Sequence, residues 1–259
     1  MFNFFKKKVK IESEEDYYNY LIEESKQDKL KTYGFNEKYA NQEERLLKIF
    51  GNCDSFNKTI KMILISDTHN CLNIEEFKQF VDNHKDYDIC ILLGDHNSYD
   101  IEKVLNCIDK SKLYGLLGNH DYNYLDEFNI NNLNGKVINV NGVSLLGIHG
   151  SFKYKPSDFP SFTQQESISF LNDKPKVDIL VSHDNRFDSK MVGNPAHQGL
   201  FGITYYLYKN KVPYHIHGHL HNPYRNELLN GTKEISVYMY ECIELKSEYW
   251  FFIKKDSVI

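Results

Sequence analysis

The stretch that decides the fold is IKMILISDTH, residues 60–69. Its first six residues form a short apolar run with β-branched side chains, which predicts a buried strand over Ile60–Ile65. Two polar side chains, Asp67 and His69, follow the run at once. Because functional residues of parallel sheets gather at the carboxyl ends of strands, we expect this strand to deliver a carboxylate and an imidazole to one sheet edge.

The same pattern recurs twice in the next stretch of chain. A strand expected over Tyr87–Leu93 ends at Gly94-Asp95, and a strand over Leu113–Leu117 ends at Gly118-Asn119-His120-Asp121. Helices expected at 74–84 and 99–110 separate these strands. Strands that alternate with helices are typical of βαβ units, so the three strands should be parallel neighbours.

The second half of the chain contains hairpins as well as buried strands. Asn141-Gly142 is a two-residue hairpin signal, and it lies between apolar runs at Lys136–Val140 and Val143–Ile148. A strand over Val177–Val181 ends at Ser182-His183. The remaining expectations are a helix over 197–210, a strand over Tyr214–His217 that leads into Gly218-His219-Leu220-His221, and a closing hairpin from Ser236–Leu245 and Glu248–Ile253.

Composition restricts the class of protein. Of 259 residues, 41% are hydrophobic and 26% charged, which suits a globular core, and no apolar run approaches the ~18–20 residues of a membrane span. The net charge of −5 argues against a general electrostatic grip on nucleic acid, although a nuclease whose metals supply positive charge stays open. The start MFNFFKKKVK does not have the pattern of a secretory signal. Five scattered cysteines indicate reduced thiols, so we expect a cytoplasmic protein. The sequence does not predict the oligomeric state.

Taken together and in this order, the five polar blocks resemble the calcineurin-like metallophosphoesterase superfamily, in particular its small bacterial and phage members. The resemblance implies an α/β fold in which two stacked mixed β-sheets are flanked by helices, a four-layer αββα sandwich. It covers roughly residues 60–250. We therefore expect a metallophosphoesterase domain over 60–259 and a helical N-terminal extension over 1–59, with helices at 14–30 and 36–50.

Carboxylate, imidazole and amide side chains are the ligands that hydrolytic metal centres use. A carboxylate has two oxygens to share, so Asp95 is the natural bridge between two ions. The resemblance implies a dinuclear centre of two divalent ions (Mn, Fe or Zn) that share Asp95. The first ion would bind Asp67, His69 and His221, and the second would bind Asn119, His183 and His219.

The resemblance further implies that His120 is not a ligand but lies over the leaving-group oxygen as a proton donor or charge stabiliser. Asp121 is then expected to accept a hydrogen bond from the His120 ring and thereby to raise the pKa of His120. Two residues are candidates for substrate contact. Arg186 has the planar fork that suits phosphate oxygens, and His197 lies in a segment similar to a lid of small bacterial members. His149 and His217 are left open as residues near the site.

The predicted function is two-metal-dependent hydrolysis of a phosphoester, a phosphodiester of nucleotide type in preference to a monoester, through attack by a hydroxide that bridges the metals. Ser98 and Asp121 depart from the pattern of the protein phosphatase branch. Two alternatives stay open. The first is a phosphomonoesterase that acts on a small molecule. The second is a non-catalytic scaffold that keeps the fold and binds a partner.

Overall fold

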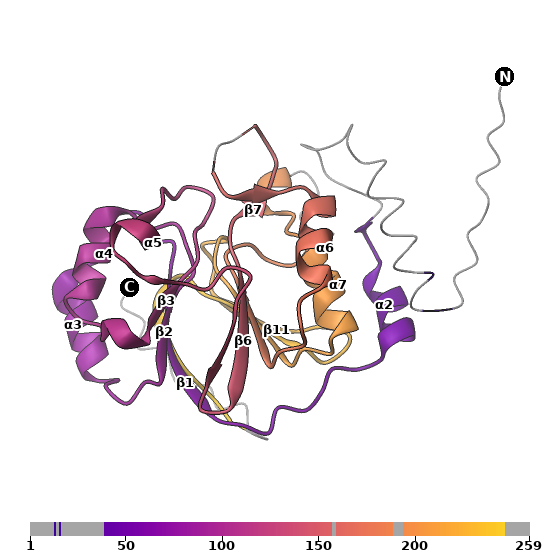
Figure 1. The fold of residues 1–259 in the computed structure, drawn as a ribbon, viewed down its shortest axis with the longest axis horizontal. Coiled ribbons are helices and arrows are strands. Elements are labelled where there is room, and N and C mark those ends of the chain that lie inside the picture. Colours follow the sequence, from indigo (N-terminus) through magenta and orange to yellow (C-terminus); the bar gives the residue numbers. More distant parts are fainter. Residues whose placement is uncertain (1–12, 14–15, 17–38, 157–158, 189–193, 247–259) are drawn as a thin grey trace.

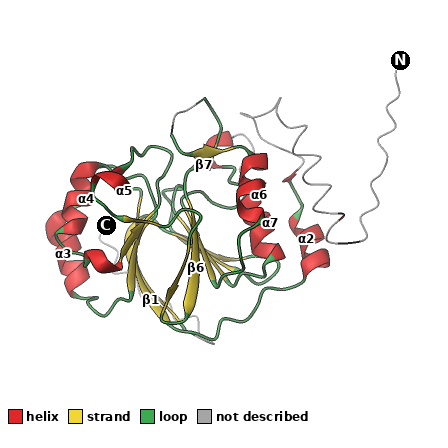
Figure 2. Cartoon of the chain, viewed as in Figure 1, coloured by secondary structure: helices red, strands yellow, loops and turns green. Residues whose placement is uncertain are grey.

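The computed structural model describes residues 13, 16, 39–156, 159–188 and 194–246. In these residues two mixed β-sheets stack face to face, and helices cover both outer faces (Figures 1 and 2). The predicted four-layer αββα architecture is therefore confirmed. No helix in the described part of the chain is long and apolar enough to cross a membrane.

The first sheet has the strand order β13-β1-β2-β3-β4. Parallel pairing joins β1 (Ile60–Ser66), β2 (Ile89–Leu92), β3 (Leu113–Gly115) and β4 (Asn131–Asn132), and β13 (Met239–Leu245) pairs antiparallel to β1. The expected helices appear as α3 (Ile74–Asp82) and α4 (Ser98–Leu105) on its outer face, followed by the short α5 (Tyr124–Glu127). Asn73 and Asn97 cap α3 and α4 by accepting backbone N–H groups of their first turns.

The second sheet has the order β11-β12-β10-β9-β6-β5. Its parallel centre consists of β6 (Val143–Ile148), β9 (Ile179–Ser182), β10 (Tyr214–His217) and β12 (Lys233–Ser236), and its antiparallel edges are β5 (Val137–Val140) and β11 (Tyr224–Glu227). The β5–β6 hairpin turns at Asn141 and Gly142 with φ of 51° and 83°, as a type I′ turn requires. A separate small sheet pairs β7 (Ser151–Phe152) with β8 (Ser161–Phe162).

Three elements differ from expectation. Ser236 ends β12 in the second sheet, whereas β13 starts at Met239 in the first, so the chain changes sheets within the strand expected over Ser236–Leu245; the partner expected at Glu248–Ile253 lies outside the described residues. The helix expected at 197–210 is a 3₁₀ turn (Pro195–His197) followed by α7 (Phe201–Lys209), because Gly199 at φ 76° interrupts it. Helix α6 (Gln164–Asn172) was not foreseen, although its capping box of Thr163 and Glu166 is visible in the sequence.

One core cluster lies between the two sheets. Side chains alternate along a strand, so β1 sends Met62 and Leu64 into the inter-sheet core and Ile63 and Ile65 beneath the helices of the first sheet. A third cluster lies between the second sheet and its helices α6 and α7. These apolar clusters fill the space between the sheets and beneath the helices. The polar side chains of the predicted site lie outside them, at the carboxyl ends of the parallel strands.

Helix α2 (Glu43–Phe50) is shorter than the helix expected at 36–50, and it lies beside α7 (Figure 1). Its Leu46 and Phe50, together with Tyr39, are buried in the cluster around α7. The helix expected at 14–30 lies outside the described residues except for Asp16. The domain boundary at residue 59 stays a prediction.

Candidate metal centre

Tight turns follow the strands and carry most of the predicted ligands. Five of the predicted ligands have positive backbone φ angles: Asp67 (54°), His69 (42°), Asp95 (59°), His219 (67°) and His221 (50°). A residue with a side chain in this region costs of order 1–3 kcal/mol, and such strain clusters where function demands it. The fold therefore holds these five side chains in place at the expense of stability.

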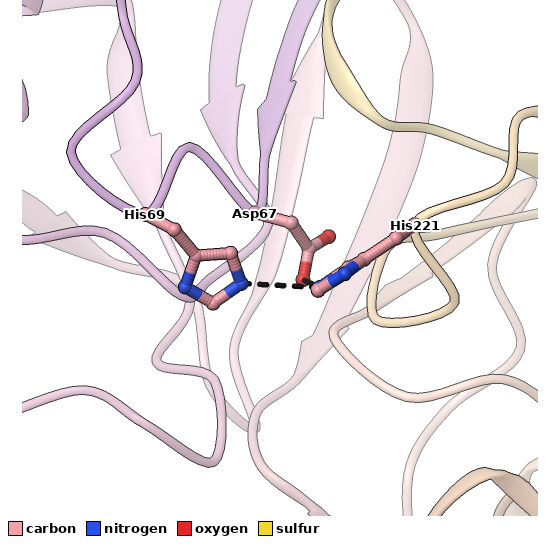
Figure 3. A group of neighbouring side chains, drawn as sticks. All are labelled: Asp67, His69 and His221. Atoms are coloured by element: carbon pink, nitrogen blue, oxygen red, sulfur yellow. Dashed lines mark hydrogen bonds and ion pairs between the residues drawn. The ribbon is translucent and has the colours of Figure 1, made fainter.

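Asp67, His69 and His221 form the first group of ligand-type side chains (Figure 3). The Nε2 atoms of His69 and His221 lie 3.0 Å apart, and His221 Nε2 lies 3.3 Å from Asp67 Oδ1. These residues come from the two sheets, because Asp67 and His69 follow β1 whereas His221 follows β10. The group thus lies at the junction of the sheets' carboxyl ends.

The Asp67 carboxylate shows which oxygen is free for a ligand role. Oδ2 accepts hydrogen bonds from the Ser66 hydroxyl (2.5 Å) and the His219 backbone N–H (2.8 Å). Oδ1 is buried and has no hydrogen-bond partner. A buried, unsatisfied carboxylate oxygen is costly, so its position against His221 fits a cation that would lie between them.

Asp95, His183 and His219 form the second group, and all three are buried. His183 Nδ1 lies 2.8 Å from the Leu93 carbonyl oxygen, which can only accept, so a neutral ring carries its proton on Nδ1. Its Nε2 then presents a lone pair to Asn119 Oδ1, 3.0 Å away, which is also an acceptor. Two lone pairs that face each other are the arrangement that a cation would satisfy.

His219 is oriented in a similar way. Its Nε2 lies 2.8 Å from the Ala196 carbonyl oxygen and donates to it, which leaves Nδ1 for a ligand role. Burial alone would lower the pKa of His183, yet the Asp95 and Asp67 carboxylates raise it above its ordinary value. The second group therefore lies in a strongly negative environment that favours cations.

Asp95 connects the two groups. Its Oδ1 accepts the His120 backbone N–H at 2.9 Å. Its Oδ2 lies 3.9 Å from His69 Nε2 of the first group and 3.6 Å from His183 Nε2 of the second. One oxygen is thus held by the backbone, and the other lies between the two groups, as a bridging ligand would.

Glycine is required where two of these turns meet. A Cβ built on Gly118 would overlap Asp95 Oδ1 and would lie 2.7 Å from His183 Cε1. The close approach of Gly118 to Asp95 therefore depends on the missing side chain.

The structure assigns Asp121 a role other than the expected one. Its Oδ2 accepts the N–H groups of Asp95 (2.8 Å) and Gly118 (2.6 Å), and its Oδ1 accepts that of His96 (2.7 Å). Among the described residues it has no hydrogen bond to the His120 ring, which corrects that expectation. Burial and the charge of Asp95 raise the Asp121 pKa to about 7. Asp121 thus holds the turns after β2 and β3 together.

His120 is exposed at the edge of the first group, and its ring centroid lies 6.1 Å from that of His69. It is not among the side chains that converge in either group. Its backbone N–H donates to Asp95, while its side chain is exposed.

The Arg186 guanidinium is paired with two carboxylates, so the described contacts give no support to its predicted contact with a substrate phosphate, which stays a prediction. Its side chain is buried and pairs with Glu43 of α2 through Nη1 and with Glu234 of β12 through Nε at 3.1 Å. Two carboxylates occupy the guanidinium. The sequence could not show this, because both partners are distant in the chain.

A third cluster of ligand-type residues, His215, His217 and Glu234, lies around the same arginine. Glu234 Oε1 is 3.7 Å from His215 Nδ1 and 3.9 Å from His217 Nε2, but Arg186 Nε is closer. The guanidinium already supplies the positive charge there, which disfavours a metal ion.

His197 and His149 have different surroundings. The His197 ring lies 5.1 Å from the His219 ring, centroid to centroid, and its Nδ1 contacts Asn194 Nδ2 at 3.0 Å. It borders the second group as a substrate contact would. His149 Nε2 is 3.3 Å from Asn134 Nδ2, and burial lowers the His149 pKa to about 4.

Sequence reasoning missed Asp184. It is buried, accepts the backbone N–H of Phe152 at 2.7 Å, and its Oδ1 lies 3.7 Å from His219 Nε2. Burial raises the Asp184 pKa to about 7. Its position directly after His183 at a strand end is the signal that could have found it.

The fold and these two groups agree with comparisons to known proteins. A family model described as calcineurin-like phosphoesterase matches residues 60–223, and the chain belongs to this family. No curated protein matches the chain significantly in sequence. Members of the family typically bind a dinuclear metal centre, and the chain has two candidate groups for it.

Solved structures agree with the fold. A dimetal phosphatase from Danio rerio has a TM-score of 0.51 and 11% identity over 73% of this chain and 94% of its own. Phosphopantetheinyl hydrolase from Mycobacterium tuberculosis has a TM-score of 0.50 and 14% identity over 71% and 91%. At these identities the likeness concerns the fold alone.

Proposed function

We propose that the chain hydrolyses phosphodiesters of nucleotide type with two divalent cations. The observation that carries the proposal is the position of Asp95 Oδ2 between the groups of His69 and His183. Two bound cations would lower the pKa of water and clamp the phosphoryl oxygens. The first would be held by Asp67, His69 and His221, the second by Asn119, His183 and His219, and both by Asp95.

The chain's own residues would do the rest of the work. Asp121 and the His120 N–H would orient Asp95. The buried Asp67 Oδ1, which has no hydrogen-bond partner, would gain one in the bound cation. The exposed His120 imidazole would pass a proton to the leaving oxygen, help that is worth roughly 10²–10⁴-fold in general acid catalysis. His197 would border the bound substrate.

The preference for a diester rests on charge. A monoester carries an additional negative charge and needs extra cationic clamps, but Arg186, the expected clamp, is engaged by Glu43 and Glu234. Mixed nitrogen and oxygen ligands suit Mn, Fe and Zn alike, so all three metals are tested, beginning with Mn²⁺. The five free cysteines support a reducing, cytoplasmic location.

The test compares bis(p-nitrophenyl) phosphate with p-nitrophenyl phosphate in the presence of Mn²⁺, Fe²⁺ or Zn²⁺. Faster hydrolysis of the diester is expected. A clear preference for the monoester would replace the proposal with a phosphomonoesterase. Metal binding without hydrolysis of either ester, or of cyclic nucleotides and short nucleic acids, would indicate a scaffold.

The shared carboxylate is tested by metal content. Asp95→Asn should lose most of both metal equivalents after loading and dialysis, because the removed charge serves both groups. Asp188→Asn, which alters an acid outside both groups, serves as the control. If Asp95→Asn retains two equivalents, the dinuclear assignment is wrong.

A further inference from the structure

We propose that Lys153 and Lys155, at the rim of the shallow hollow between Asn119 and the segment after β7, bind a second phosphate of the substrate, and that Tyr122 stacks on the base of the leaving nucleoside. This inference deepens the proposed function and rests on it. The ligand class is a nucleotide diester that carries a further phosphate, as in a short single-stranded oligonucleotide.

Backbone hydrogen bonds place this segment against the metal centre. Gly150 N–H donates to the Leu117 carbonyl at 2.7 Å, just before Asn119, and Phe152 N–H donates to Asp184 at 2.7 Å. β7 therefore lies next to both turns of the second group, above one end of the sheets (Figure 1). The residues that follow β7 therefore lie close to Asn119 of the second group.

Two lysines lie in this position. Asn119, Ser151, Lys153, Tyr154 and Lys155 line one small hollow. Neither lysine ammonium has an ion-pair partner among the residues that the structure describes, although Lys155 Nζ lies 5.2 Å from the centroid of the Tyr154 ring. Two ammonium groups beside a proposed ligand, with no ion pair in the described part of the chain, are suited to an anion. Arg186 is engaged by Glu43 and Glu234, and these two lysines are the cationic residues that line the hollow.

An exposed aromatic ring completes the surface. Tyr122, two residues after His120, is 82% exposed, and its ring centroid lies 5.7 Å from that of Phe159. A ring left in water has a free area for stacking, and base–aromatic stacking tolerates any base. Because His120 would serve the leaving group, the base beside it belongs to the leaving nucleoside.

The phosphate is tested with three diesters in Mn²⁺: a dinucleotide with a terminal phosphate on the leaving nucleoside, the same dinucleotide without it, and bis(p-nitrophenyl) phosphate. The phosphorylated dinucleotide should be preferred over the unphosphorylated one by about 10-fold in kcat/KM, the value of one charge-assisted contact. In the double variant Lys153→Gln, Lys155→Gln this ratio should fall to near one. The control Lys110→Gln, Lys136→Gln changes the net charge equally on other surfaces and should keep the ratio.

Salt provides an independent measure that a loss of structure would not reproduce. The slope of log kcat/KM against log salt for the phosphorylated dinucleotide should be flatter in the Lys153, Lys155 variant than in wild type, because the charge contact that salt screens has been removed. An unchanged slope or an unchanged ratio would overturn the phosphate site. If wild type hydrolyses bis(p-nitrophenyl) phosphate without any such ratio, only this inference fails; without hydrolysis of any diester, the proposed function fails.

The base is tested with an analogue whose leaving unit lacks it. Wild type should lose about 10-fold in kcat/KM on the abasic analogue, within the range for stacking on one aromatic side chain. Tyr122→Ala should discriminate little between the two substrates, whereas Tyr122→Trp should restore the discrimination. Tyr99→Ala, at another exposed tyrosine (61%), is the control. Equal discrimination by wild type and Tyr122→Ala would overturn the stacking role.

Discussion

At the scale of single residues, the candidate metal centre contains side chains that converge as ligands would and side chains that fix the backbone of the turns. The side chains of Asp95, His183 and His219 converge, whereas the Asp121 carboxylate faces the backbone. His120 belongs to neither set, because its backbone N–H orients Asp95 while its ring is exposed. These roles lead to different consequences of mutation.

Substitution of His120 should affect chemistry without affecting metal content. His120→Ala is expected to keep both metals and to lose roughly 10²–10⁴-fold in rate, the contribution of a general acid. The loss should be smaller for a p-nitrophenolate leaving group than for a ribose hydroxyl, because an acidic leaving oxygen needs little protonation. Elemental analysis and rates on aryl and alkyl diesters measure both effects. A lost metal, or an equal fall for both leaving groups, would contradict the role.

Asp121→Asn should show the opposite behaviour. The amide can accept through only one oxygen, so at least one of three buried N–H groups loses its partner, at a cost of about 1–3 kcal/mol. We expect weaker metal binding and lower stability, with a rate loss that does not depend on the leaving group. Metal titration and urea denaturation check this. A rate loss confined to poor leaving groups would instead support the predicted hydrogen bond between Asp121 and the His120 ring.

At the scale of elements, α2 packs on the second sheet and its helix α7 and contacts the segment that follows the predicted ligand His183. Glu43 pairs with Arg186, three residues after His183, and accepts the Tyr208 hydroxyl of α7 at 3.0 Å. Leu46 (0% exposed) and Phe50 (7%) are buried beside it. The helix therefore contributes to the core of the second sheet.

Two truncations separate this helix from the chain before it. A protein that begins at residue 39 should keep α2 and its contacts, whereas one that begins at residue 51 should be destabilised by several kcal/mol, since each large buried side chain is worth about 2–5. Urea denaturation of both proteins measures the difference. Equal stability of the two would show that α2 contributes nothing to the core.

The ion pair of α2 is tested by a single substitution. Glu43→Gln should reduce stability, because one carboxylate partner of the buried Arg186 is removed while Glu234 remains. Glu44→Gln, at the exposed neighbouring position, is the matched control and should change little. An effect of equal size at both positions would contradict a specific role of the pair.

At the scale of the whole molecule, buried charge links stability to pH. Burial alone would raise the pKa of Glu234, but Arg186 holds it below its ordinary value. A depressed carboxyl pKa contributes stability above the unfolded pKa of about 4.3, and this contribution is lost as pH falls. In metal-free protein, the stability advantage of wild type over Glu234→Gln should therefore shrink on acidification below roughly pH 5. Denaturation at several pH values checks this, and a constant difference would refute it.

Local patterns in the sequence determined the order of the elements and the positions of the candidate ligands. Short apolar runs that end in polar residues predicted β1, β2, β3, β9 and β10, and the structure has strands there. Since parallel strands bring their carboxyl ends to one edge, Asp67 and Asp95 had to lie near each other. The Asn141-Gly142 turn was equally local, because its two residues specify the backbone geometry by themselves.

Only the tertiary structure decided which distant groups pair. Arg186 meets Glu43 and Glu234, and Asp121 meets the N–H groups of two turns, through contacts that no local pattern encodes. The switch of sheet between β12 and β13 and the placement of Lys153 beside Asn119 depend likewise on packing. The physical reason is that strand and turn preferences act over a few residues, whereas the partner of a buried charge is set by the packing of whole sheets and helices.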